Sequence, residues 1–155
     1  MNTVEKKLFI LILLIAVSAA IHAQSAQLNL SVNIRELYDD VQAGAPVPAG
    51  GFYVLNGTVT ARKITNADEG VFVGELIISS GSWLDEGNIE LSSCIIVLAG
   101  ESYRKAIPAR RSRRANPDEI QLKSELLVYG KLTGTAEYDG EMLPVIEAEG
   151  LRRLD

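Results

Sequence analysis

ELLVYGKLTGTAEYDGEMLPVIEAEGLRRL, residues 125–154, predicts a β-hairpin in a chain of 155 residues. Two extended segments, 125–138 and 142–154, flank the turn 139–141. Asp139-Gly140 in this turn is a specific hairpin signal, because both residue types tolerate the positive φ angles of the tightest hairpin turns. We therefore expect the C-terminal part of the chain to be an antiparallel strand pair.

Three further extended segments precede this hairpin, at 52–64, 71–79 and 89–100. The polar turns NADEG (66–70) and SGSWLDEGN (80–88) separate them. Gly57, near the middle of the first segment, predicts a bulge or a sharp bend there. Five strands with interior glycines indicate a mainly β chain that forms a small, strongly bent five-stranded barrel.

The N-terminal region predicts a short strand followed by a short helix. LNLSVNI (28–34) alternates apolar and polar residues, with Leu28, Leu30, Val32 and Ile34 on one side. From Asn33 the apolar spacing becomes helical, and Glu36 three residues later completes a capping-box pattern. We expect the helix to continue to about Gln42. The proline- and glycine-rich AGAPVPAGG (43–51) then forms a connector.

The first 23 residues have the layout of a cleaved signal peptide. Lys6 and Lys7 precede the apolar run LFILILLIAVSAA (8–20), and IHA ends at the small residue Ala23. A retained membrane anchor is the competing interpretation, but a span needs about 20 apolar residues. The sequence therefore predicts cleavage, a periplasmic or secreted protein, and no stable membrane span afterwards.

Cleavage would leave an N-terminal strand, helix and linker over 24–51 and a barrel domain over 52–155. Without residues 1–23, which carry Lys6, Lys7 and Glu5, the remaining 13 basic and 19 acidic residues give a net charge of −6. Cys94 is the only cysteine, so no internal disulfide is possible, and its apolar surroundings CIIVL predict a buried hydrophobic role.

The composition argues against most catalytic chemistry. His22, the only histidine, lies in the predicted signal peptide, so the mature chain would have no Ser-His-Asp triad, Cys-His pair or histidine metal ligand. The sequence contains no P-loop, dinucleotide-binding, CxxC or EF-hand motif. We expect a non-enzyme without cofactor or bound metal.

Three groups of residues resemble the small exported OB-fold domains of bacteria. They are Glu36-Leu37-Tyr38, Gly57-Thr58-Val59 and Val128-Tyr129-Gly130-Lys131-Leu132-Thr133-Gly134, and the resemblance covers about residues 33–154. It implies an OB-like barrel, but no particular function. The segment 101–124 departs from the pattern, because it is basic and proline-bearing where an OB fold often carries a helix.

RKAIPARRSRRANP (104–117) is the best candidate contact site. It carries Arg104, Lys105, Arg110, Arg111, Arg113 and Arg114. The guanidinium fork suits phosphate or carboxylate partners. A solvated loop between two strands is an equally open interpretation.

Three functions follow, in decreasing order of expectation. The first is an exported, non-catalytic binding or envelope-associated structural module for a protein or an anionic envelope component. The second is a carboxylate-dependent glycan enzyme using Glu147 and Glu149 or the acidic residues of 137–141. The third is an oligonucleotide-binding OB domain. Nucleic acid is expected to be an unlikely partner, because the mature chain is acidic and IELSSCIIVL (89–98) has no aromatic residue.

Overall fold

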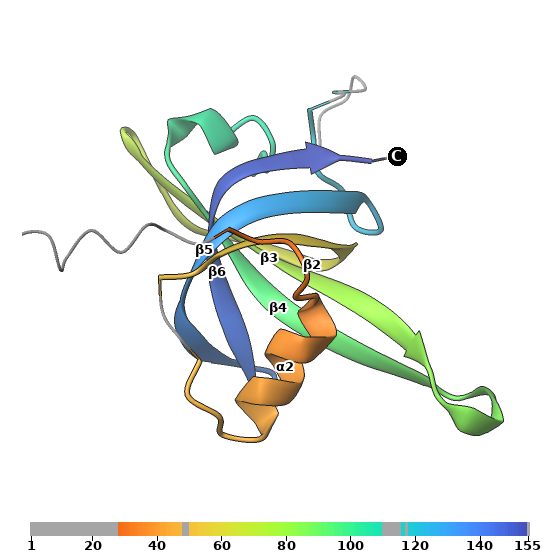
Figure 1. Cartoon of the computed structure of the whole chain (residues 1–155). Helices are drawn as coiled ribbons and strands as arrows, with labels where there is room; N and C mark the ends of the chain where they lie inside the picture. Colours follow the sequence, from red (N-terminus) through yellow and green to blue (C-terminus); the bar gives the residue numbers. More distant parts are fainter. Residues whose placement is uncertain (1–27, 48–49, 110–115, 117, 155) are drawn as a thin grey trace, which may run out of the picture.

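The computed structural model describes residues 28–47, 50–109, 116 and 118–154 (Figure 1). The predicted signal peptide, residues 1–23, lies outside the described residues. The elements follow in the order β1 (Leu28–Asn29), α2 (Ile34–Gln42), β2 (Phe52–Asp68), β3 (Val71–Trp83), η1 (Asp85–Gly87), β4 (Ile89–Ala99), η2 (Glu101–Tyr103), β5 (Glu125–Tyr138) and β6 (Glu141–Arg153).

The five long strands close into one barrel, as the sequence predicts. Their order is β2-β3-β4-β6-β5, and β5 pairs back onto β2. The long strand β2 makes this closure possible, because its first half pairs with β5 up to Thr58 and its second half pairs with β3 from Thr58 onward. All barrel pairs are antiparallel except β4 with β6, which is parallel. This mainly β, five-stranded barrel with one short helix confirms the OB-like fold.

The N-terminal strand is much shorter than the alternation of 28–34 predicts. Only Leu28 and Asn29 pair with β2, and Leu30 is exposed. The side chain of Asn29 ends the strand, since its Oδ1 accepts hydrogen bonds from the backbone N–H groups of Ser31 and Val32. Local side-chain bonding of this kind competes with strand pairing.

The helix begins where the sequence predicts. Glu36 N–H donates to the Asn33 side chain at 3.0 Å, and Asn33 N–H donates to Glu36 Oε2 at 3.3 Å. This capping box fixes the first turn. Ile34 and Leu37 are buried in the barrel core together with Cys94, so α2 covers one end of the barrel.

Gly57 has another role than the predicted bulge. The register of β2 against β3 shifts between Val59 and Ala61, and again between Ile64 and Asn66. At Gly57 a Cβ atom would lie 2.9 Å from Ile34 Cδ1 and 3.1 Å from the Ser79 carbonyl oxygen. Glycine is needed there because helix and strand approach closely.

The segment between β4 and β5 covers the other side of the core without an α-helix among its described residues. Ile107 and Ile120 from this segment are buried in the core. Glu119 is buried as well, and its carboxylate lies 3.4 Å from the guanidinium of Arg62.

Candidate groove on the outer face of the barrel

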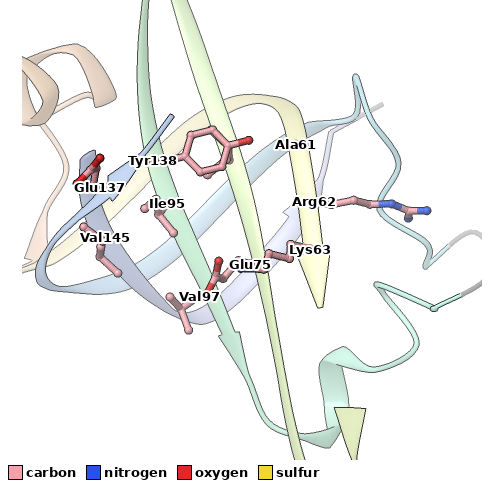
Figure 2. Close-up of a pocket in the computed structure, with 11 residues that line it drawn as sticks. Ala61, Arg62, Lys63, Glu75, Ile95, Val97, Glu137, Tyr138 and Val145 are labelled. Atoms are coloured by element: carbon pink, nitrogen blue, oxygen red, sulfur yellow. The ribbon is translucent and has the colours of Figure 1, made fainter. Parts of the chain in front are cut away.

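A groove of about 400 Å³ lies on the outer face of the barrel, between the second half of β2 and the hairpin β5–β6. Figure 2 shows its lining residues, with Glu137, Tyr138 and Val145 on the hairpin side and Ala61, Arg62 and Lys63 on the β2 side. Its lining comprises Ala61, Arg62, Lys63, Glu75, Ile77, Ile95, Val97, Ala136, Glu137, Tyr138 and Val145.

The floor of the groove is apolar because β3 and β4 carry apolar residues on both faces. Leu76 and Ile78 of β3 point into the barrel core, whereas Ile77 between them belongs to a second cluster with Ile95 and Leu143. Ile77 and Ile95 are directly opposite each other on neighbouring strands. The uninterrupted runs LII and CIIVL already contain this signal, since a strand with one solvated face alternates.

Polar groups and one aromatic ring form the rim. Tyr138 is 42% exposed, and Lys63 is exposed opposite Glu75 on the adjacent strand. Glu75 Oε1 accepts a hydrogen bond of 2.9 Å from Thr65 Oγ1, which orients this carboxylate. Arg62 points away from the other labelled side chains in Figure 2, and it donates to the Ile120 carbonyl at 2.8 Å.

Helix α2 holds the hairpin wall of the groove in place. Tyr38 O–H donates to Glu141 Oε2 at 3.2 Å, and Gln42 Nε2 donates to the Met142 carbonyl at 2.7 Å. Burial of the Tyr38 hydroxyl, followed by the nearby Glu141 carboxylate, raises the pKa of Tyr38 above its usual value. The hydroxyl therefore remains a hydrogen-bond donor at neutral pH.

The structure gives the predicted site residue Arg104 several internal partners. Its Nε donates to Glu101 Oε2 at 2.6 Å, and its two terminal nitrogens donate to the carbonyls of Ala67 and Asp68 at 2.9 and 2.7 Å. The guanidinium carbon also lies 5.2 Å from the centre of the Phe72 ring. Arg104 thus ties η2 to the turn between β2 and β3.

The other basic candidates do not form a described cluster with Arg104. Lys105 is exposed beside it. Arg110, Arg111, Arg113 and Arg114 lie outside the described residues, so their contact with a partner stays a prediction.

The candidate carboxylates divide between two surfaces. Glu147 and Glu149 are exposed on β6, and Glu147 lies opposite Lys131 of β5. Glu137 lines the groove, whereas Glu141 accepts the bond from Tyr38. Within the part of the chain that the structure describes, no group of three or more His, Cys, Asp or Glu side chains could hold a metal ion. None of the described helices is long and apolar enough to cross a membrane.

Comparisons with known proteins found similarity among solved structures alone. Neither the protein-family models nor the curated proteins match this sequence. Among solved structures, the chain is similar to the SSB of Plasmodium falciparum in complex with ssDNA. The two sequences are 14% identical, the alignment covers 67% of this chain and 94% of that chain, and the TM-score is 0.46. PriB of Ralstonia solanacearum follows, with 16% identity, coverages of 70% and 100%, and a TM-score of 0.42. The small single-stranded DNA-binding protein of Streptomyces coelicolor has 12% identity, coverages of 66% and 90%, and a TM-score of 0.43.

One prediction is wrong on these findings, namely that nucleic acid is an unlikely partner. The similar solved structures include single-stranded DNA-binding proteins, one of them in complex with ssDNA. The prediction used the net charge of the mature chain and the lack of aromatic residues in 89–98. Folding instead brings Lys63 and Tyr138, 75 positions apart in the sequence, to the rim of one groove. The chain is an OB-fold-like barrel with an apolar groove on its outer face.

Proposed function

We propose that this protein is a non-catalytic binding domain whose groove takes a short stretch of single-stranded nucleic acid. The half-exposed Tyr138 ring above an apolar floor, with Lys63 on the opposite rim, is the observation that supports this proposal. OB folds take oligonucleotides and oligosaccharides on the outer face of their second and third strands, flanked by two hairpins. Here those strands are β3 and β4, and the flanking hairpins are β2–β3 and β5–β6.

Each part of a nucleotide has a matching group in the groove. A base can stack on the Tyr138 ring and place its flat surface against Ile77 and Ile95. Lys63 can neutralise a phosphate on the β2 side. The Glu75 and Glu137 carboxylates can accept hydrogen bonds from N–H groups at a base edge, such as the N3–H of thymine or the exocyclic amino group of cytosine. The cation and the ring therefore contribute affinity, and the carboxylates contribute selectivity.

The charge of the groove predicts modest affinity. Lys63 is the exposed cation of the lining, whereas Arg62 is bonded to Glu119 and Ile120. We expect about one phosphate contact. A plot of the logarithm of the binding constant against the logarithm of the salt concentration should then have a slope of about −0.7. This shallow slope separates groove binding from non-specific attraction to a basic surface.

Fluorescence anisotropy with a labelled oligothymidine tests the proposal. Tyr138→Ala should weaken binding about 5- to 150-fold, because stacking of one base on an aromatic ring contributes about 1–3 kcal/mol. Tyr129→Ala is the matched control, since Tyr129 is 41% exposed and stacks on Phe52 outside the groove. Lys63→Gln should flatten the salt dependence.

Equal affinities of wild type, Tyr138→Ala and Tyr129→Ala would contradict the proposal. A glycan is the second candidate ligand, because two carboxylates, Glu75 and Glu137, line the same groove as Tyr138. A labelled neutral oligosaccharide serves as the second probe in the same assay. Tyr138-dependent binding of this probe, without binding of oligothymidine, would assign the groove to glycans.

A further inference from the structure

The hairpin between β3 and β4 extends beyond the barrel (Figure 1). In the described chain, β2 pairs with β3 only up to Thr58 and Ser79, and β6 pairs with β4 only from Ile95 onward. Between these two points β3 and β4 pair with each other alone, up to Trp83 and Ile89. Residues 80–92 therefore form a projecting two-stranded ribbon.

One face of this ribbon is apolar and exposed. Trp83 lies opposite Ile89, and Gly81 lies opposite Leu91, so all four are on the same face. Trp83 is 76% exposed, Ile89 55% and Leu91 60%. These are unusually high values for three large apolar side chains that are neighbours on one surface.

The opposite face of the ribbon is already covered at its base. Arg35 of α2 lies 3.2 Å from the Glu90 carboxylate, and Ser92 is fully buried. Arg35 pairs with both Glu90 and Asp39, so α2 leaves the apolar face of the ribbon open. The outer edge of β3 at Ser80 and Gly81 borders a pocket of about 170 Å³ that Glu125 and Leu154 also line.

The backbone along the outer edge of β3 has hydrogen-bonding groups that no other described strand pairs with. Leu84 N–H donates to the Asn88 carbonyl across the ribbon at 2.8 Å. Because bonding alternates along an antiparallel pair, Ser82 also bonds across the ribbon, whereas the backbone groups of Gly81 and Trp83 point to the outer edge. The edge sequence SGSW (80–83) contains no charge and no proline, the usual protections against strand pairing.

We propose that this edge of β3 pairs antiparallel with the same edge of a second copy of the chain. A two-fold axis near Gly81 and Ser82 would make the contact self-complementary, and the acidic turns at Asp85 would point to opposite ends. The two ribbons would form one four-stranded sheet, in which the two apolar faces join. Glu90 would not enter the joined apolar surface, since it lies on the opposite face of the ribbon, where it pairs with Arg35.

The size of the contact predicts a weak dimer. Edge pairing places the two apolar faces side by side on one surface of the joined sheet, so only part of each face leaves water, which is less than the roughly 150–250 Å² that full burial of one tryptophan removes. Stable interfaces bury about 800 Å² per partner. The exchange between monomer and dimer should therefore be reversible at micromolar to millimolar concentrations.

Sedimentation velocity across this concentration range, on the protein as it is recovered from the host cell, tests the proposal. Gly81→Lys places a charge at the centre of the contact, and its Cβ has ordinary space, 3.4 Å from Ile89 Cγ2 and 3.6 Å from Leu91 Cδ2. Gly150→Lys is the matched control, because nothing lies within 4 Å of a Cβ atom there. Wild type and Gly150→Lys should dimerise, and Gly81→Lys should dimerise at least tenfold more weakly.

Trp83 gives an independent readout because it is the only tryptophan of the chain. Its emission should shift to shorter wavelength as the wild type dimerises.

A second lysine variant covers the case in which Gly81→Lys does not fold. Leu91→Lys then replaces it, and Leu122→Lys, at a similarly exposed position, is the control. A wild type that stays monomeric at every concentration, or a lysine variant that dimerises like its control, would overturn the proposal. A shift of Trp83 emission only with phosphatidylcholine vesicles would assign the ribbon to a lipid surface instead. Oligothymidine binding through Tyr138 is measured separately and does not depend on this contact.

Discussion

Gly130 is the position of β5 at which a side chain would be least tolerated. The register of β5 against β6 shifts between Tyr129 and Gly130. A Cβ atom at Gly130 would lie 2.5 Å from the Glu147 carbonyl oxygen and 2.6 Å from Ile146 Cγ2. The Glu147 carbonyl oxygen belongs to the backbone and cannot move without disturbing the strand pair, so the bend of the barrel at this point requires glycine.

Gly130→Ala should lower the free energy of unfolding by about 1–3 kcal/mol, because overpacking a tight contact forces the backbone to shift. Urea denaturation followed by circular dichroism measures this change. Gly150→Ala is the control, since its Cβ would meet open space, and it should change stability by less than about 0.5 kcal/mol. Similar stability of both variants would show that the clash at Gly130 is relieved without cost.

At the scale of elements, the turn between β2 and β3 depends on η2. Arg104 bonds the carbonyls of Ala67 and Asp68, and Glu101 Oε1 accepts the N–H of Gly70. The hydrogen bond from Arg104 is the main reason why the pKa of Glu101 is lowered below its usual value. The same bond raises the pKa of Arg104. The charged carboxylate is therefore the form that holds this turn.

Glu101→Gln should lower the melting temperature at pH 7, and this effect should shrink as the pH falls below about 4.5. A lowered pKa in the folded state means that the stabilisation is fully present above the unfolded pKa of about 4.5 and is lost as the pH falls through the folded pKa. Thermal melts of both forms across this pH range measure the difference. The control Glu69→Gln removes an exposed carboxylate from the same turn. An effect of Glu101→Gln that stays the same as the pH falls to the point where the wild type unfolds would mean that shape, not charge, holds the turn.

At the scale of the whole molecule, two segments outside the strands complete the core. Ile34 and Leu37 of α2 are buried against one part of the barrel, and Ile107 and Ile120 of the segment between β4 and β5 against another. Residues that precede the barrel in sequence thus belong to its core. The chain from α2 to β6 should unfold as one cooperative unit.

The N-terminal segment should be removed during export. We expect the mature chain to begin at or near Gln24, because a basic start, a thirteen-residue apolar run and a small residue precede it. N-terminal sequencing of the protein from periplasmic or extracellular fractions measures the cleavage position. Recovery of intact Met1–Ala23 from membranes would contradict this prediction and indicate an anchor.

Local chemistry was readable from the sequence. The capping box of Asn33 and Glu36 involves residues three positions apart, and the hairpin turn at Asp139-Gly140 needs only positive φ angles, which the structure gives as 53° and 84°. The barrel class followed from five strands that are separated by turns. Such features depend on neighbours in the chain, so pattern alone predicts them.

The groove and the ribbon depended on contacts between residues far apart in the chain. Lys63, Ile95 and Tyr138 line one groove only because β2, β4 and β5 close into a barrel. The role of Arg104 likewise appeared only when folding placed it against Ala67 and Asp68. The sequence by itself determined roughly where the five long strands, the helix and the turns lie, but not where each strand ends, since residues 80–83 of the predicted turn 80–88 belong to β3. The tertiary structure alone decided which distant side chains meet, because the order in which the strands pair sets those distances, and the spacing of residues along the chain fixes pairing only within a hairpin.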